Sequence, residues 1–309
     1  MPEFSLLAAT RAIESAMPFV LYRLITLLGG ALALLFGALG GAGTFIAFAS
    51  FSKNPAAFAN VGAVLGFAGA ALLLHKLRAE LLFKVEAGHL TLMAEQLRGA
   101  NLPAGWAQVD QAKRAAADRF EKGAVFYPLK DTLATALSAL PAHYSGFVYR
   151  LQANPAGKPL AWITGRIVLA DALAILAAHC ADNASNNPWI SARGGVLRLA
   201  RQFDRLLRQR LQCLVFELLG FISLYALLLY PIDWAVSDLP VQIGYWRHVF
   251  ALVFAYSLTA TFFQPIATMA MAPAYAQGKE AEPVPTSAER AALAEQSDAI
   301  RRILAEAER

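Results

Sequence analysis

Charged residues are scarce in this chain of 309 residues. Asp, Glu, Lys and Arg make up only 16% of the sequence, hydrophobic residues make up 57%, and the mean hydropathy is +0.45. An average soluble domain carries about 25% charged residues. This composition excludes a disordered protein and an ordinary soluble enzyme, and it indicates an integral membrane protein.

Cysteine is nearly absent, and so are the motifs of common enzyme sites. Cys180 and Cys213 are too few for a disulfide framework or a structural zinc site. The five histidines lack zinc-ligand spacing such as H-E-x-x-H, and no Walker loop, nucleophile elbow or alternating strand pattern is found. We therefore expect no enzyme activity, no catalytic residues, no metal and no cofactor. The net charge of +5 is not accompanied by a nucleic-acid-binding motif, so we expect no nucleic-acid partner.

Long charge-free runs predict four membrane-spanning helices. The runs 24–52 and 54–74 hold 29 and 21 residues without a formal charge, and about 18 apolar residues suffice to cross a bilayer. The run 211–230 is interrupted only by Glu217, and 249–272 has no charge. We expect an all-α polytopic membrane protein in which these helices form two transmembrane hairpins.

Lys and Arg are concentrated between the two hairpins. Residues 75–210 hold 18 of the 27 basic residues and 10 acidic ones, whereas the turn at 52–55 holds only Lys53. Because positively charged flanks stay in the cytoplasm, we expect both termini on that side (N-in/C-in), in a bacterial inner membrane. The chain then divides into a first part with the first hairpin, a cytoplasmic or interfacial helical region, the second hairpin and a tail: 1–75, 76–210, 211–272 and 273–309. Helices of the cytoplasmic region are expected at 76–97, 104–122, 130–150 and 161–180.

Two small-residue motifs occur in the first hairpin. Gly37 and Gly41 are four residues apart in the first span, and Gly62 and Gly66 are four apart in the second. Such spacing lets helix backbones approach closely in lipid. The glycines can therefore pack the two spans on each other or form an interface between subunits of a homo-oligomer.

Four arginines precede the third span. On one continuous helix, Arg198, Arg201, Arg205 and Arg208 would fall within an arc of about 80°, opposite apolar side chains. This pattern predicts a basic amphipathic helix at the inner headgroup layer, where anionic lipids are attracted. The helix would anchor the topology, bind lipid headgroups, or form the vestibule of an anion path.

A few polar residues in apolar surroundings are candidates for a transport path. Glu217 is the only formal charge within a predicted span, and such groups usually face protein or a wet cavity. Gln264 and Pro265 interrupt the fourth span, where proline favours a kink. Asp171 lies in an apolar segment too short to cross the bilayer. The alternatives are that Glu217 snorkels to the interface and that the proline kink is purely structural.

The tail carries a helix start signal. Thr286 and Glu289 have the spacing of a capping box, and Leu293, Ile300 and Leu304 fall on one side of the helix that follows. We expect a terminal cytoplasmic helix able to pair with a copy of itself.

One stretch resembles known sequences. The segments Asp171-x-x-Ala174 to Ala177, Asn187-Pro188-Trp189 and Ser191 to Gly194, with Gly244-Tyr245-Trp246, resemble uncharacterised bacterial multi-pass proteins distantly similar to the choline-transporter-like family. The chain departs from that family by having fewer spans and no large extracellular loop, so no binding residue is carried over. We expect a homo-oligomeric channel or transporter for a small ion or solute. The alternative is a non-conducting scaffold that binds anionic lipid.

Overall fold

The computed structural model describes most of the chain, and every regular element in it is a helix. The described residues are 4–49, 54–120, 123–140, 154–159, 171–181, 187–237, 246–276 and 285–309.

Among these residues, four helices are long and apolar enough to cross a membrane, as the charge-free runs predict. They are α2 (Met17–Phe48), α3 (Pro55–Leu81), α12 (Phe203–Ser237) and α13 (Trp246–Ala276). The helix α2 packs along α3, α12 packs along α13, and α13 also contacts α2. The predicted all-α fold, with two hairpins of helices that are long and apolar enough to span a membrane, is therefore confirmed.

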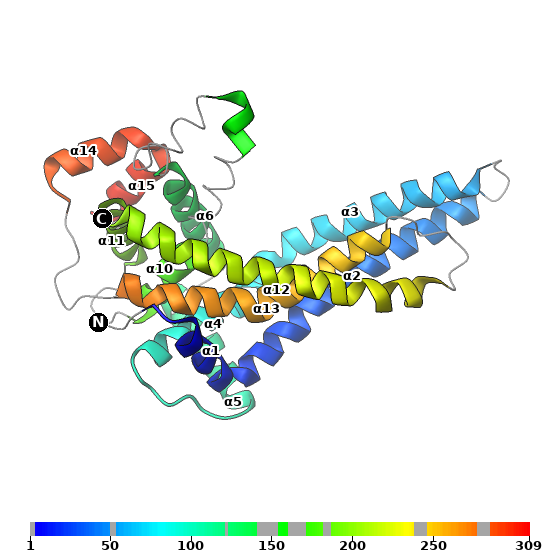
Figure 1. Ribbon diagram of the computed structural model, residues 1–309, viewed down its shortest axis with the longest axis horizontal. Helices are drawn as coiled ribbons and strands as arrows, with labels where there is room; N and C mark the ends of the chain where they lie inside the picture. The colour runs from blue at the N-terminus through cyan, green and yellow to red at the C-terminus, as the bar shows by residue number, and fades with distance from the viewer. Residues whose placement is uncertain are drawn as a thin grey trace.

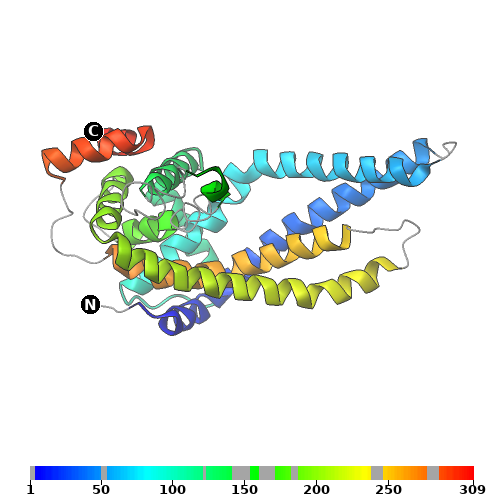
Figure 2. The ribbon, with the colours of Figure 1, turned by 45° about the horizontal axis from the view of Figure 1, so that its top comes forward.

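The shorter helices gather at one end of these four, in what we call the head (Figures 1 and 2). They are α1 (Leu6–Ser15), α4 (Phe83–Leu97), α5 (Trp106–Phe120), α6 (Gly123–Ala139), the 3-10 turn η1 (Pro155–Gly157), α10 (Asp171–Ala181), α11 (Pro188–Arg201), α14 (Ser287–Gln296) and α15 (Asp298–Glu306). Both ends of the chain also lie at the head (Figure 1). The structure thus places the termini on the same side of the long helices, as an N-in/C-in arrangement requires.

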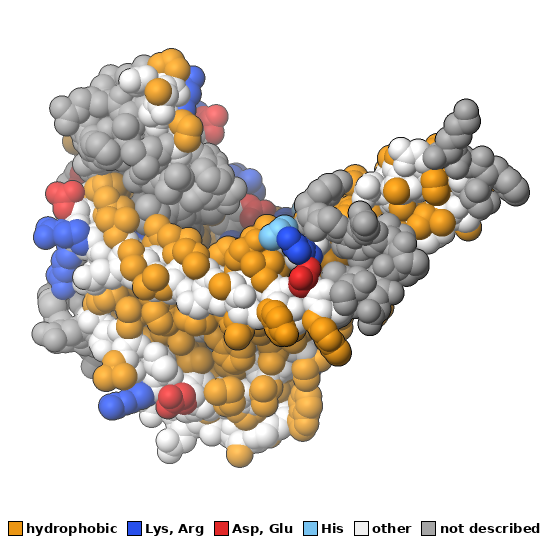
Figure 3. Space-filling view, turned by 45° about the vertical axis from the view of Figure 1, so that its right-hand side comes forward, with side chains coloured by type: hydrophobic (Ala, Val, Ile, Leu, Met, Phe, Trp, Pro, Cys, Tyr) orange, Lys and Arg blue, Asp and Glu red, His pale blue; other side chains and the backbone are white. Residues whose placement is uncertain are grey.

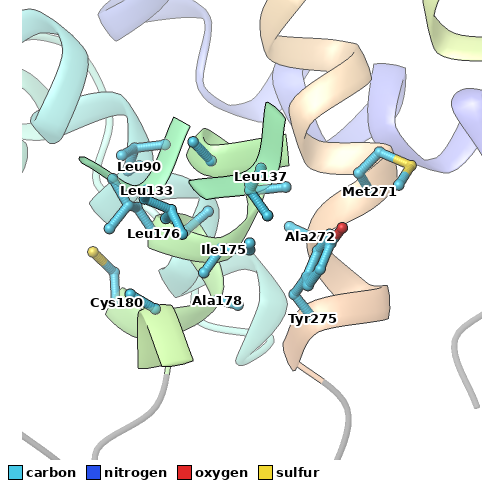
Figure 4. Packing of buried hydrophobic residues seen from close by; sticks show 14 of the residues in the cluster. Leu90, Leu133, Leu137, Ile175, Leu176, Ala178, Cys180, Met271, Ala272 and Tyr275 are labelled. Atoms are coloured by element: carbon cyan, nitrogen blue, oxygen red, sulfur yellow. The ribbon is translucent and has the colours of Figure 1, made fainter. Parts of the chain in front are cut away.

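The head has one hydrophobic core to which nearly all of its helices contribute. The core runs from Ala9 in α1 to Leu304 in α15 and includes the head-side ends of α12 and α13. At its centre, Ile175 and Leu176 of α10 lie between Leu133 of α6 and the last turns of α13 (Figure 4). The long helices, by contrast, carry many exposed hydrophobic side chains, which dominate the face shown in Figure 3. Such exposure suits contact with lipid.

Two helix boundaries differ from the sequence expectation. The helix expected over 76–97 is interrupted at Leu82, where the exposed α3 ends and the buried α4 begins. The helix expected to start at residue 130 starts at Gly123 and continues through Pro128. An interior proline costs about 3 kcal/mol, but Phe126 and Leu129 on either side of it are fully buried. Burying a large apolar side chain contributes about 1.5–3 kcal/mol, so these two side chains offset the cost. Residues 141–150 and 161–170 of the expected helices lie outside the described residues.

The tail folds back onto the head. The capping box of Thr286 and Glu289 is present as predicted, but the backbone is extended at Ser297, so the tail forms two helices instead of one. Its apolar residues Leu293, Ile300 and Leu304 are buried in the head core, where α15 contacts α6 and α11. That face is therefore occupied within the chain, and pairing with a second copy would require the tail to leave the head.

Candidate functional site

The four glycines of the first hairpin lie in a seam where α2 and α3 touch backbone to backbone. A methyl group at Gly41 would lie 2.1 Å from the carbonyl oxygen of Gly62, and one at Gly66 would lie 2.0 Å from the oxygen of Gly37. No side chain fits at such distances. The structure thus uses these glycines for packing within the hairpin, the first of the two alternatives.

The four arginines do not lie on one helix, so the prediction of one continuous basic amphipathic helix is wrong. The helix α11 ends at Arg201, Gln202 has non-helical torsions, and α12 begins at Phe203. The reason lies in long-range packing. A methyl group at Gly195 would come within 2.6 Å of Ile175, so α11 packs tightly on α10, whereas α12 follows the direction of its partner α13. The chain changes direction between the two.

Two of these arginines bind the protein itself. Arg198 donates a hydrogen bond to the carbonyl oxygen of Tyr275. Arg201 forms a forked pair with Glu289 of the tail, at 2.9 and 3.0 Å, and its hydrogen bonds lower the pKa of Glu289 to about 2. Arg205 and Arg208 are exposed at the start of α12, and Arg208 also donates to the carbonyl oxygen of Asp204.

Asp171 and Glu217, two of the candidate path residues, meet at a third residue. The guanidinium of Arg210 lies 2.8 Å from Glu217 and 3.9 Å from Asp171. The hydroxyl group of Tyr275, near the end of α13, donates a hydrogen bond of 2.9 Å to Oδ2 of Asp171. We call Asp171, Arg210, Glu217 and Tyr275 the carboxylate cluster. It joins α10 of the head to both helices of the second hairpin.

The carboxylate cluster is buried, and this changes its acid–base chemistry. Asp171 and Arg210 are only 1% and 4% exposed. Burial raises the pKa of Asp171 from 3.8 to about 7, and Glu217 adds to the increase, while Arg210 and the hydrogen bond from Tyr275 act in the opposite direction. Oδ1 of Asp171 has no hydrogen-bond partner among the described residues, so it can carry a proton. Near neutral pH, the cluster can therefore take up or release one proton.

Gln264 and Pro265 lie within α13, which continues as a helix through the proline. Oε1 of Gln264 accepts a long hydrogen bond of 3.5 Å from Arg23 of α2. The candidate path residues thus form two groups, one around Arg210 and one around Arg23. Among the described residues, no three His, Cys, Asp or Glu side chains converge as metal ligands would.

Sequence reasoning missed the residues that connect these groups. In the sequence, Arg210 is one of several basic residues that precede the third span, and Arg23 is the last charge before the first span. Tyr275 lies 104 residues from Asp171, and no local pattern signals their hydrogen bond.

Comparisons with known proteins do not place the chain in a family. No protein-family model matches the chain, and no curated protein or solved structure matches it. The resemblance to the choline-transporter-like family stays a hypothesis.

Proposed function

We propose that this membrane protein is a homo-oligomeric transporter or channel for a small ion or solute, gated by proton binding to the carboxylate cluster. The observation that carries the proposal is the pair of carboxylates, Asp171 and Glu217, sharing one buried arginine. An ionisable group in such a place is costly, and it is most often found where ions or protons move.

The position of the cluster suits a gate. Arg210 is buried, but the next residue, Leu211, is among the exposed apolar side chains of α12. The cluster therefore lies where the lipid-facing surface of the second hairpin begins. By the distribution of basic residues, we assign this boundary to the cytoplasmic face of a bacterial inner membrane.

Protonation would change the forces between the head and the hairpin. With Asp171 ionised, Arg210 is shared by two carboxylates. With Asp171 neutral, the attraction to α10 weakens and Arg210 pairs with Glu217 alone. If the pKa of Asp171 differs between two conformations of the head and the second hairpin, each pKa unit of difference corresponds to about 1.4 kcal/mol. Binding of one proton can therefore shift the equilibrium between these two conformations. Four spans enclose little polar volume, which is why we propose that several copies surround the path.

Flux measurements on purified protein in sealed vesicles test this proposal. Under a valinomycin-imposed K⁺ potential, an internal pH dye should report faster proton movement than in empty vesicles, and ion substitution should reveal any other permeant ion. Asp171→Asn should remove the dependence of flux on pH between 6 and 8, and Glu217→Gln should reduce flux.

The matched control is Asp131→Asn, which removes a carboxylate paired with an arginine on the surface of the head, 3.4 Å from Arg78. It should leave flux unchanged. Folded wild-type protein that moves no ion, or Asp171→Asn protein with the wild-type pH profile, would refute the gate.

The scaffold alternative is favoured by a separate observation, the exposure of Arg205 and Arg208 at the start of α12. In that case, replacing both by Gln should lower the retention of anionic lipid in native mass spectrometry, in a protein that shows no flux.

A further inference from the structure

An apolar cleft of about 740 Å³ lies between the two hairpins. Its walls come from all four long helices, including Thr26 to Leu34 of α2, Phe221 of α12 and Tyr256 of α13. Its volume falls in the range of about 300–1,000 Å³ that is typical of small-molecule sites. The cleft borders the lipid-facing surface, because Tyr256 is largely exposed.

Two glycines keep the cleft open. A methyl group built on Gly29 would meet no atom within 4 Å, and one on Gly30 would only touch Leu74 at 4.0 Å. These glycines differ from those of the seam, because no helix approaches them. Their missing side chains leave the space empty instead of allowing contact.

A buried cation, Arg23, lies one turn before the first residue of α2 that lines the cleft. Arg23 precedes Thr26 and Leu27 by one turn of α2, on the same face of the helix. Arg23 is only 8% exposed. Its Nε has no hydrogen-bond partner among the described residues, and its bond to Gln264 is long.

Arg23 also has no close ion pair within the described chain. The acidic group with the largest electrostatic effect on it is Glu86, which is already paired with Lys130. A buried charge without a close partner is costly, so an anion at this position would be bound favourably.

The dimensions of the cleft match one leaflet of a bilayer. The stretch of α2 from Thr26 to Leu34 is about 12 Å long at roughly 1.5 Å per residue, and one half of the hydrocarbon core is about 15 Å thick. An anionic headgroup at Arg23 would therefore lie at the boundary of the core, with its chain running along the cleft.

We propose that the cleft binds an acyl chain of an anionic phospholipid of the phosphatidylglycerol type, whose phosphate pairs with Arg23. This site is separate from the exposed arginines of α12, and it does not depend on the proposed transport activity. Arg23 would give the preference for anionic lipid, and the space beside Gly29 would give the room for the chain.

Native mass spectrometry of delipidated protein tests the site. Phosphatidylglycerol and phosphatidylcholine with identical chains are added in turn, and the lipid retained at a fixed collision energy is counted. Wild-type protein should retain one phosphatidylglycerol molecule in preference to phosphatidylcholine. Gly29→Leu fills the cleft and should abolish retention of that molecule.

The matched control is Gly43→Leu on the same helix, since a methyl group there also meets nothing within 4 Å and Gly43 lies outside the cleft. It should retain lipid like the wild type. Arg23→Gln should lower the preference for phosphatidylglycerol by at least about tenfold, the lower end of the loss expected for one hydrogen bond to a charged group, while phosphatidylcholine is retained as before. If Arg23→Gln does not fold, the two glycine variants decide the matter alone. Equal lipid retention by Gly29→Leu and Gly43→Leu, or a lipid-free wild-type protein, would overturn the proposal.

Discussion

Replacing Gly41 by alanine should weaken the first hairpin, because the seam has no room for a methyl group. The new carbon would lie 2.1 Å from the carbonyl oxygen of Gly62, whereas ordinary van der Waals contact begins near 3.4 Å. Backbone atoms cannot rotate away as a flexible side chain can. The two helices would have to separate by about 1.3 Å at this point, the difference between those two distances.

The size of the effect follows from two opposing terms. Overpacking a tight contact costs about 1–3 kcal/mol, while alanine is better than glycine in a helix by up to about 1 kcal/mol. Gly43→Ala gains the helix propensity of alanine without the overpacking cost, since its methyl group would meet open space. The difference between the two variants therefore isolates the clash, and it should be about 1–3 kcal/mol.

Thermal unfolding of purified protein in one detergent, at one scan rate, measures this difference. We expect Gly41→Ala to unfold several degrees below Gly43→Ala, at about 2–4 °C per kcal/mol for a protein of this size. Adding Gly66→Ala to Gly41→Ala should cost less than the sum of the two single changes, because helices already separated leave room for the second methyl group. Equal Tm values for Gly41→Ala and Gly43→Ala would show that α2 and α3 do not touch at this seam.

Two further predictions concern the head. Folded protein should hold the proton of Asp171 up to about pH 7, whereas the unfolded chain releases it near pH 3.8. The free energy of unfolding of the wild type should therefore fall by up to about 4 kcal/mol as pH rises between these values, and that of Asp171→Asn should not. Parallel plots of Tm against pH from 5 to 8 for the two proteins would contradict this prediction. Ile300 of the tail helix α15 is fully buried in the head core, and truncating a buried isoleucine costs about 2–5 kcal/mol. Ile300→Ala should therefore speed limited proteolysis of residues 285–309 at least tenfold, while Glu295→Ala on the exposed face of α14 should not. Equal digestion rates would mean that this side chain does not hold the tail on the head.

The sequence predicts the long helices and their pairing because those features depend on local composition. A bilayer requires uninterrupted apolar runs, and the few residues between 48 and 55 and between 237 and 246 leave antiparallel hairpins as the simplest arrangement. The capping box of Thr286 is likewise a local signal.

The candidate site could be predicted only in part, because it depends on contacts distant in sequence. Asp171 and Glu217 stand out as charges in apolar segments, but Arg210, which joins them, has the same appearance as any basic residue flanking a span. The break at Gln202 depends on how closely α11 packs on α10 at Gly195. The contact of Arg23 with Gln264 connects residues 241 positions apart.

The composition of the head core has a consequence for how the protein is made. Among the described helices, α1 is synthesised first and α15 last, and both contribute buried residues to the same core, together with the ends of the second hairpin. Chains fold from the N-terminal side during synthesis, so this core cannot close until both hairpins are in place and the tail has left the ribosome. A chain in which one hairpin fails to insert would keep the surface around Ile175 and Leu133 exposed, and such surfaces are what cellular proteases and chaperones recognise. Closure of the head therefore requires that both hairpins have been inserted.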